Sequence, residues 1–316
     1  MTSPVIRCVK EQLKSEVHFL TKEKYKSLLQ YNPHIDKLHL FTNEWEELRN
    51  ELRSEEFSLV IDLHKTVRSI RMRTIFSCPV ISFNKFTLEK WMFLNLRINR
   101  LPDNHLIDQF FKGLKDIKVV NDGKGMELFI DHDTERRVLR ILENHKIRNS
   151  YTVLVIGGAH LTKQIPIELA IDYINKTTEP IVLVGGPEET EKSKKIVEFS
   201  NRHINNMVGI YSLLESAILI RESQLVITGD TGMMHMAAAY NKKIVTVYGS
   251  TAPVFGMYPY MTNPDINPMF MVNEHLSCWP CSKSGRPKCP KEHMRCLREW
   301  QGNDIINLIN RESIRN

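Results

Sequence analysis

Residues 223–249 read SQLVITGDTGMMHMAAAYNKKIVTVYG. One apolar run ends at Gly229, a helical segment of small residues begins near Gly232, and a second apolar run ends at Gly249. Near-continuous apolar strands that alternate with helices are typical of a parallel sheet covered on both faces. The stretch therefore predicts a strand–helix–strand unit of an α/β protein.

The same alternation runs through the whole chain, with segments of helical apolar spacing between the strands. Two such sets predict an α/β fold of two doubly wound, Rossmann-like domains with parallel sheets. The polar stretch 143–150 is the predicted hinge, which divides the chain into residues 1–148 and residues 149–316. Further strands are predicted at 17–20, 37–41, 57–63, 78–83, 151–158, 180–186 and 206–210.

The composition is that of a globular protein, and its mild basicity either serves solubility alone or indicates an anionic partner. The 316 residues are 42% hydrophobic and 25% charged, with a formal net charge of +6. A mildly basic protein suits a nucleotide, a lipid headgroup or nucleic acid. Nucleic acid is the weakest of these, because no arginine–aromatic interleaving or long basic tract occurs. No apolar run approaches the ~18 residues of a membrane span, and the first residues do not resemble a signal peptide. We predict a cytoplasmic protein that does not bind nucleic acid.

Four loops after predicted strands are rich in glycine and polar residues. Because the carboxyl ends of parallel strands meet at one edge of a sheet, these loops are expected to converge on one ligand site. None contains Gly-x-Gly-x-x-Gly or Gly-Lys-Ser/Thr, so neither a dinucleotide fingerprint nor an ATPase P-loop is predicted. The loops are 157–163 (GGAHLTK), 185–189 (GGPEE), 229–232 (GDTG) and 249–253 (GSTAP).

The triplet Asp230-Thr231-Gly232 has two interpretations. Aspartic proteases use it twice, because two aspartates share one proton, whereas this chain contains it once. At the start of a helix the triplet instead offers unpaired N–H groups and a positive dipole end to a phosphate. Asp230 can then accept hydrogen bonds from sugar hydroxyls, or it can simply cap the helix. His235 would lie on the first turn, where a packed or surface histidine is the more ordinary interpretation.

Two other loops supply candidate ligand contacts. Lys163 is a candidate for a second phosphate contact, because a compact cation offsets the charge of a diphosphate. A solvated lysine is the alternative. Glu188 follows the strand 180–186, where an acid often binds ribose hydroxyls.

These residues together resemble glycosyltransferase family 9, the ADP-heptose:lipopolysaccharide heptosyltransferases. The resemblance extends over nearly the whole chain, and its cysteine tail is similar to that of the heptosyltransferase II branch. It implies a GT-B fold with an N-terminal acceptor domain and a C-terminal nucleotide-sugar domain. It also implies inverting transfer of heptose from ADP-heptose to the lipopolysaccharide inner core, with lipid A–Kdo–heptose as acceptor. The stretches that carry it are 155–166 (VIGGAHLTKQIP), 182–189 (VLVGGPEE), 230–253 (DTGMMHMAAAYNKKIVTVYGSTAP) and 278–297 (CWPCSKSGRPKCPKEHMRCL).

The resemblance also implies roles for particular residues. Asp230 would hold the heptose, while Thr231 and Gly232 would meet the diphosphate. The stretch 60–69 (VIDLHKTVRS) resembles the part of the first domain that faces the acceptor, and a solvated helix face is its alternative. The remaining donor-side candidates are Thr162, Lys163, Glu188 and His235, and the acceptor-side candidates are Asp62, His64, Lys65, Arg68 and Arg71.

The beginning of the chain departs from the family. Family members open with a strand and a Gly-Asp-x-x-x-Thr loop, whereas residues 2–13 (TSPVIRCVKEQL) resemble the helix after that loop. The aspartate expected as general base would therefore lie before Met1, and we expect a start site upstream or a truncated chain. One alternative is a degenerate, non-catalytic GT-B protein that binds nucleotide or glycan. Another is a different GT-B nucleotide-sugar enzyme, such as an epimerase.

Four cysteines cluster near the C-terminus, and the first two have the Cys-x-x-Cys spacing of zinc sites. A structural metal, free thiols and a labile disulfide are all compatible with the spacing. No acid pair of the Asp-x-Asp kind stands at a strand end, so no catalytic divalent metal and no cofactor are predicted. The clustered residues are Cys278, Cys281, Cys289 and Cys296.

Residues 85–101 mix large apolar side chains with lysines and arginines. Such a stretch suits peripheral contact with the anionic surface of the inner membrane, where a lipid acceptor is anchored. A packed amphipathic helix is the alternative.

Overall fold

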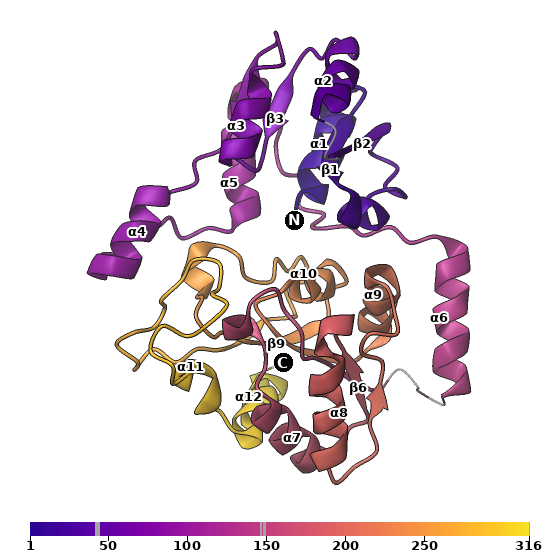
Figure 1. Cartoon of the computed structure of the whole chain (residues 1–316), viewed down its shortest axis with the longest axis vertical. Coiled ribbons are helices and arrows are strands. Elements are labelled where there is room, and N and C mark those ends of the chain that lie inside the picture. The colour runs from indigo at the N-terminus through magenta and orange to yellow at the C-terminus, as the bar shows by residue number, and fades with distance from the viewer. Residues whose placement is uncertain (42–44, 146, 148–149, 316) are drawn as a thin grey trace. The chain divides into compact units, whose positions relative to one another are not determined.

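The computed structural model describes residues 1–41, 45–145, 147 and 150–315. The chain forms two compact units (Figure 1). Unit 1 contains residues 1–88 and 102–130, and unit 2 contains residues 89–101 and 131–316. The predicted boundary between residues 148 and 149 lies outside the described residues, and the chain passes into unit 2 earlier, after Ile130.

The six strands described in unit 2 form one parallel sheet in the order β10-β9-β8-β5-β6-β7. Strand β5 is central and pairs with both β6 and β8. The chain thus builds outward on one side of β5 and then on the other, which is the predicted doubly wound arrangement. The strands are β5 (Thr152–Val155), β6 (Ile181–Val184), β7 (Asn205–Asn206), β8 (Leu225–Gly229), β9 (Lys243–Val247) and β10 (Met269–Met271).

Helices form a layer on each face of this sheet (Figure 1). One layer contains α7 (Ile167–Lys176), α8 (Thr190–Phe199) and α12 (Gly302–Arg315), and the other contains α6 (His132–Asn144), α9 (Leu213–Glu222) and α10 (Gly232–Ala239). Every residue of β5, β6 and β8 is buried. Both faces of each central strand therefore need apolar side chains, which explains the near-continuous apolar sequence.

Local signals in the sequence account for most of these boundaries. Helix α9 begins with a capping box, in which the Ser212 hydroxyl accepts from the Glu215 amide at 3.3 Å and the Glu215 carboxylate accepts from the Ser212 amide at 2.8 Å. Strand β10 and the short helix α11 (Arg295–Arg298) were not predicted. Elements of three or four residues are too short to show a periodicity.

Unit 1 contains the four strands predicted in the first half of the chain, paired two and two. Strand β1 (His18–Lys22) pairs in parallel with β2 (Lys37–Phe41), and β3 (Val60–Asp62) pairs in parallel with β4 (Val80–Ser82). Among the described residues the two pairs are separate sheets, and most of their residues are only half-buried. The helices of unit 1 are α1 (Ser3–Leu13), η1 (Glu23–Leu28), α2 (Trp45–Ser54), α3 (Val67–Arg73), α5 (Leu106–Gly113) and η2 (Lys115–Ile117).

A buried arginine fastens α1 within unit 1. The side chain of Arg7 is 1% exposed, and its guanidinium lies 2.8 Å from Asp122 Oδ1 and 2.5 Å from Glu127 Oε2. Arg7 Nη2 also donates to the Gly125 carbonyl at 3.0 Å. A buried charge is tolerated when it is paired and hydrogen-bonded, so these contacts hold α1 against residues 122–127.

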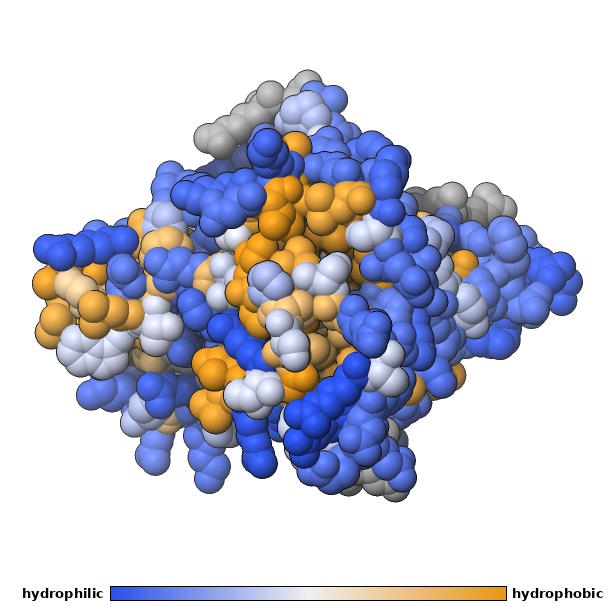
Figure 2. Space-filling model, turned by 90° about the horizontal axis from the view of Figure 1, so that it is seen from above, coloured by the Kyte–Doolittle hydropathy of each residue, from blue (hydrophilic) through white to orange (hydrophobic). Residues whose placement is uncertain are grey.

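Helix α4 (Thr87–Leu96) has one packed side and one exposed apolar side. Phe93 contacts Phe255 edge to face, and Arg97 donates to the carbonyls of Ser277 and Pro280. Leu88, Trp91 and Leu96 are exposed. Figure 2 shows apolar surface gathered at the left, where α4 lies, beside hydrophilic surface. None of the described helices is long and apolar enough to span a membrane, and peripheral membrane contact stays a prediction.

Candidate functional site

The loops after β5, β8 and β9 meet at one edge of the unit 2 sheet. The loop after β5 forms a short 3₁₀ helix, η3 (Leu161–Lys163), that crosses the ends of the other two strands. A Cβ on Gly229 would lie 1.9 Å from the Lys163 carbonyl oxygen, and a Cβ on Gly249 would lie 2.0 Å from the Thr162 carbonyl oxygen. Glycine at these two strand ends therefore allows η3 to lie directly on the sheet edge.

Lys163 and Asp230 form an ion pair at this edge. Lys163 Nζ lies 2.9 Å from Asp230 Oδ2, and the two side chains are 15% and 5% exposed. The sequence predicted both residues as ligand contacts but did not predict that they meet. Burial raises the pKa of Tyr248 well above its ordinary value, and the nearby charge of Asp230 raises it further. The pair thus places a largely buried cation and anion side by side at the ends of the strands.

Helix α10 begins directly after this ion pair. Its N-cap residue is Thr231, whose hydroxyl caps no helix amide and lies 3.2 Å from the Thr228 hydroxyl. Asp230 pairs with Lys163 instead of capping the helix, which decides against the capping alternative. A Cβ on Gly232 would meet no atom within 4 Å. The first turn therefore lacks a side-chain cap and has open space beside it, as an anion site requires.

His235 lies on the first turn of α10 and is half-buried, as the sequence predicted for its place on the helix. Its neighbours Met234 and Met236 are buried and serve as packing.

The loop after β6 places two adjacent acids differently. Glu188, predicted near the ribose, is exposed on the 3₁₀ helix η4 (Pro187–Glu189). Glu189 is 3% exposed, and its carboxylate accepts from the Gly186 amide at 2.8 Å and from Gln164 Nε2 at 3.2 Å. Burial raises the pKa of Glu189, although the hydrogen bond from Gly186 opposes the shift. Glu189 joins the loops after β5 and β6, while Glu188 is accessible to a ligand.

Lys192 of α8 was not predicted as part of this region. Its Nζ donates to the Ile156 carbonyl at 2.8 Å and to Gln164 Oε1 at 3.3 Å. Burial lowers the pKa of Lys192 to about 8, although the carboxylates of Glu189 and Glu168 oppose the shift. A lysine in a charged helical segment suggests a solvated side chain. The only signal in the sequence was its position one turn after a strand-end loop.

Thr162 contacts the rest of the protein rather than open space. Its side chain is buried, and its hydroxyl donates to the Arg286 carbonyl at 2.9 Å and accepts from the Arg286 amide at 2.8 Å. The Ser250 hydroxyl lies 2.8 Å from it. These contacts use the one donor and two acceptor positions of a hydroxyl. Thr162 was predicted as a donor-binding residue. In the structure its side chain instead positions η3 through these hydrogen bonds.

In unit 1, the predicted acceptor residue Asp62 is also engaged internally. Asp62 Oδ1 accepts from the amides of His64 and Lys65 at 2.9 and 2.7 Å, and Oδ2 accepts from Arg73 Nε and Nη2 at 3.0 and 2.8 Å. Burial acts to raise the pKa of Asp62, but the hydrogen bonds from Lys65, Arg73 and His64 outweigh it and lower the pKa. Asp62 therefore shapes the loop before α3.

The other acceptor candidates form a basic surface on and before α3. Arg68 stacks 5.0 Å from the Phe41 ring and Arg71 stacks 5.7 Å from the Trp45 ring. Lys65 Nζ donates to the Phe83 carbonyl at 3.1 Å. Partial desolvation lowers the pKa of His64, and the charges of Lys85, Arg68 and Lys22 lower it further. Arg68 is thus close enough to His64 to act on it electrostatically, and Arg68 and Arg71 are each held against an aromatic ring.

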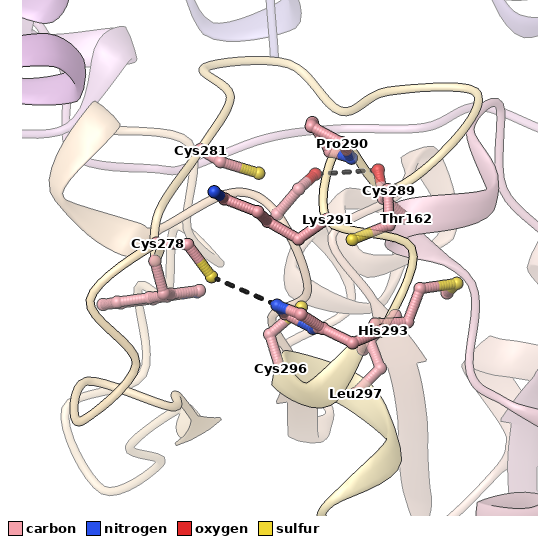
Figure 3. Close-up of a pocket in the computed structure, with 12 residues that line it drawn as sticks. Thr162, Cys278, Cys281, Cys289, Pro290, Lys291, His293, Cys296 and Leu297 are labelled. Atoms are coloured by element: carbon pink, nitrogen blue, oxygen red, sulfur yellow. Dashed lines mark hydrogen bonds between the residues drawn. The ribbon is translucent and has the colours of Figure 1, made fainter.

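The four clustered cysteines line one cavity of about 90 Å³ (Figure 3). All six cysteines of the chain are free thiols. Cys278 Sγ lies 3.8 Å from His293 Nε2. Burial raises the pKa of Cys281 and raises that of Cys296 to about 12, and the neighbouring cysteines add to both shifts. The sequence cluster is therefore also a cluster in space.

Among the described residues, one set of three potential metal ligands has its ligand atoms close together, and it lies in unit 1, where none was predicted. His18, His39 and Glu55 place ligand atoms within 4.8 Å of one another. Each has another partner: His18 Nδ1 lies 3.0 Å from His39 Nε2, His39 Nδ1 lies 2.6 Å from Glu51, and Glu55 pairs with Lys37. These contacts explain why the three side chains lie close together.

A doubly wound parallel sheet with charged groups and an open helix start at its strand ends has the arrangement in which α/β proteins place their ligand sites. The glycosyl transferase family 9 structure from Veillonella parvula DSM 2008 is similar to the whole chain, with a TM-score of 0.78 and 20% identity over 100% of this chain and 93% of that one. The E. coli heptosyltransferase WaaC, solved with ADP-2-deoxy-2-fluoro heptose, has a TM-score of 0.64 and 17% identity over 98% and 94%. These similarities show the GT-B fold that the sequence predicted.

The chain belongs to glycosyltransferase family 9 (heptosyltransferase), whose pattern matches residues 45–288. The lipopolysaccharide heptosyltransferase 1 of Campylobacter coli is 24% identical over 259 residues, which cover 75% of each chain. The protein is thus a heptosyltransferase-like glycosyltransferase, which confirms the predicted enzyme class.

Proposed function

We propose that this protein transfers a heptose from ADP-heptose to the inner core of lipopolysaccharide, with lipid A–Kdo–heptose as acceptor and with inversion at the anomeric carbon. Support comes from its similarity to a lipopolysaccharide heptosyltransferase and from a similarly folded enzyme solved with an ADP-heptose analogue. The proposed donor site is the edge of the unit 2 sheet, and the proposed acceptor surface is the basic face of unit 1.

The observation that carries the proposal is the Lys163–Asp230 ion pair beside the uncapped start of α10. A donor diphosphate replaces Asp230 as the partner of Lys163, and the carboxylate then accepts hydrogen bonds from the heptose hydroxyls. Negative charge grows on the departing diphosphate as the bond to the anomeric carbon breaks. Lys163 and the first amides of α10, at Thr231 and Gly232, stabilise that charge. Exposed Glu188 binds the ribose hydroxyls.

The acceptor hydroxyl attacks from the opposite side and loses its proton as the new bond forms. The phosphate and carboxylate groups of a lipid A–Kdo acceptor suit the basic surface formed by His64, Lys65, Arg68 and Arg71. Asp62 positions the loop that carries two of these residues.

The test is transfer of heptose from ADP-heptose to a lipid A–Kdo–heptose acceptor, followed by mass spectrometry. We expect Asp230→Ala to lower kcat/KM by about 10- to 100-fold, as for the loss of hydrogen bonds to a charged group. We expect Lys163→Met to lower kcat by about 100-fold, because a charge that stabilises the leaving group is lost. Lys194→Ala is the matched control, since it removes a lysine from an exposed ion pair with Glu191.

The outcomes separate the competing functions. Equal activity of Asp230→Ala and the unchanged protein would rule out the sugar-holding role. ADP binding without turnover on any donor would identify a non-catalytic binding protein. Conversion of free ADP-heptose in the absence of acceptor would identify an epimerase-like enzyme.

A further inference from the structure

Two histidines and a glutamate of unit 1 come together on one face of the β1–β2 pair. The strand register places His18 opposite Lys37, and alternate residues of a strand point to the same face, so His18 and His39 share that face. Glu55 follows directly after α2, which packs against β2 (Figure 1). His18, His39 and Glu55 each place one ligand atom within 4.8 Å of those of the other two. Three separate segments of the chain thus bring two imidazoles and a carboxylate to one point.

A carboxylate holds the outer nitrogen of each imidazole ring. His39 Nδ1 lies 2.6 Å from Glu51 Oε1, and His18 Nε2 lies 3.0 Å from Glu16 Oε1. An ionised carboxylate only accepts hydrogen bonds, so each of these two ring nitrogens carries the proton of its imidazole. A histidine that binds a metal almost always donates its other ring N–H to a carboxylate, a carbonyl or water in this way. Both rings therefore have the tautomer of a metal ligand.

The inner nitrogens of the two rings face each other as lone pairs. His18 Nδ1 lies 3.0 Å from His39 Nε2, and neither nitrogen carries a proton when the outer nitrogens of neutral rings carry it. Lys37 pairs with Glu55 Oε1, which leaves Oε2 3.7 Å from His18 Nδ1. Lone pairs at such short distances repel each other unless a cation lies among them. A proton or a metal ion can supply this positive charge.

The third ligand and the surroundings favour a metal ion. A proton joins only two atoms, and the 3.7 Å between Glu55 Oε2 and His18 Nδ1 is too long for a hydrogen bond. A metal ion can contact all three ligand atoms at about 2.0–2.2 Å. His39 is 1% exposed and His18 is 9% exposed, and Phe57 packs edge to face against both rings. Phe57 thus excludes water from one side of the ligands, while the half-buried Glu55 leaves a polar side for the entry of an ion.

We propose that His18 Nδ1, His39 Nε2 and a carboxylate oxygen of Glu55 bind one Zn²⁺ ion, with water in the fourth position. Two imidazoles and one carboxylate form a donor set that Zn²⁺ uses in proteins. Glu51 and Glu16 hold the two rings in the required tautomers. The ion links β1, β2 and the chain after α2, and it stabilises a two-stranded sheet that is marginal by itself. The site lies outside the proposed donor and acceptor residues, so this inference does not rest on the proposed function.

The first test is a Zn²⁺ titration of the full chain, purified without a histidine tag and freed of metal with a chelator. Nuclear magnetic resonance of ¹⁵N-labelled histidine rings follows binding, and we expect the resonances of His18 Nδ1 and His39 Nε2 to shift until the site is saturated. Because the signals come from these two rings, an ion held by cysteines does not contribute to them. Unchanged rings in excess Zn²⁺, or a proton that stays between the two nitrogens, would overturn the proposal.

The second test repeats the titration with three variants. Glu55→Gln removes a direct ligand and should weaken Zn²⁺ binding by at least about 100-fold, whereas Glu51→Gln removes the carboxylate behind His39 and should weaken it by about tenfold. Glu46→Gln is the matched control, because it alters an exposed carboxylate of α2 that pairs with Arg49, and it should bind Zn²⁺ unchanged. Equal affinity of Glu55→Gln and Glu46→Gln would overturn the proposal. Circular dichroism checks the fold of each variant, and the titration of the unchanged protein decides if Glu55→Gln does not fold.

The stabilising role is tested by hydrogen exchange of the metal-free and the zinc-loaded protein. At a free Zn²⁺ concentration of about ten times Kd, the amides of β1 and β2 should exchange about tenfold more slowly, because opening of this strand pair then requires loss of the ion. The amides of β3, in the other strand pair of unit 1, should change by less than about twofold. Equal slowing of both pairs would show a general effect on unit 1 and would contradict the assignment. None of these measurements uses a nucleotide or an acceptor, so failure of the proposed function leaves their result intact.

Discussion

At the scale of single residues, Lys163 and Lys192, two lysines near the strand ends of unit 2, differ in their surroundings. Lys163 is paired with Asp230, whereas Lys192 is half-buried and donates to the Ile156 carbonyl and the Gln164 side chain. The carboxylates of Glu189 and Glu168 also act on it electrostatically. Burial lowers the pKa of Lys192 from its ordinary 10.5 to about 8. The charged form of Lys192 therefore destabilises the folded protein at neutral pH, and the size of this destabilisation depends on pH.

Lys192 predicts a specific pH dependence of stability. Below pH 8 the lysine is protonated in both the folded and unfolded states, so its full penalty is present. Between pH 8 and 10.5 the unfolded chain binds more protons than the folded chain, so stability rises with pH. The unfolding free energy of the unchanged protein minus that of Lys192→Met should therefore rise by on the order of 3 kcal/mol across this window.

Urea unfolding of both proteins at about pH 7.5, 9 and 10 measures this difference in unfolding free energy. Lys194→Met is the control, because it alters an exposed lysine of the same helix. A difference that stays constant or falls with pH would show that Lys192 is not desolvated.

The position of the candidate residues at the strand ends could be predicted from sequence, but the internal hydrogen bonds of the site could not. Asp230, Lys163 and Glu188 follow from the rule that functional loops lie at the carboxyl ends of parallel strands. The internal bonds of Thr162 and Asp62 depend on which distant segment packs beside each side chain, and the spacing of residues along the chain contains no such information.

At the scale of elements, the crossing of η3 over the ends of β8 and β9 depends on two glycines. We expect Gly229→Ala to lower the free energy of unfolding by about 2–3 kcal/mol, because its Cβ would overlap the Lys163 carbonyl oxygen 1.9 Å away. The same displacement of η3 should raise the KM for ADP-heptose. Gly232→Ala is the control for stability, since its Cβ meets no atom within 4 Å and it lies within a helix.

Urea unfolding of the two variants decides between steric overlap and a general effect of losing glycine. An equal effect of both substitutions would contradict the assignment of Gly229 to the close approach of η3. From sequence, the glycines were recognised as strand ends, but the segment that lies on them was not. The elements that were not predicted include β10 and α11, which are too short to show a periodicity.

At the scale of the whole molecule, the two units differ in how well their strands are buried. The central strands of unit 2 lie within a continuous sheet and are buried at every residue, whereas the strands described in unit 1 form two pairs with mostly half-buried residues. The sequence predicted two α/β domains because both halves have the same alternation. Alternation by itself indicates which elements form and not how many strands pair.

The difference in burial predicts unequal local stability. A two-stranded sheet is marginal by itself, whereas a sheet covered on both faces opens only with global unfolding. We expect the amides of β5, β6 and β8 to exchange with deuterium at least about 100-fold more slowly than those of β1 and β3 in the same sample. Hydrogen exchange followed by mass spectrometry measures both sets of peptides at once, so temperature and pH are matched internally. Equal protection of the two sets would show that the units unfold as one cooperative structure, in which case the two pairs of unit 1 are stabilised by more than their own burial.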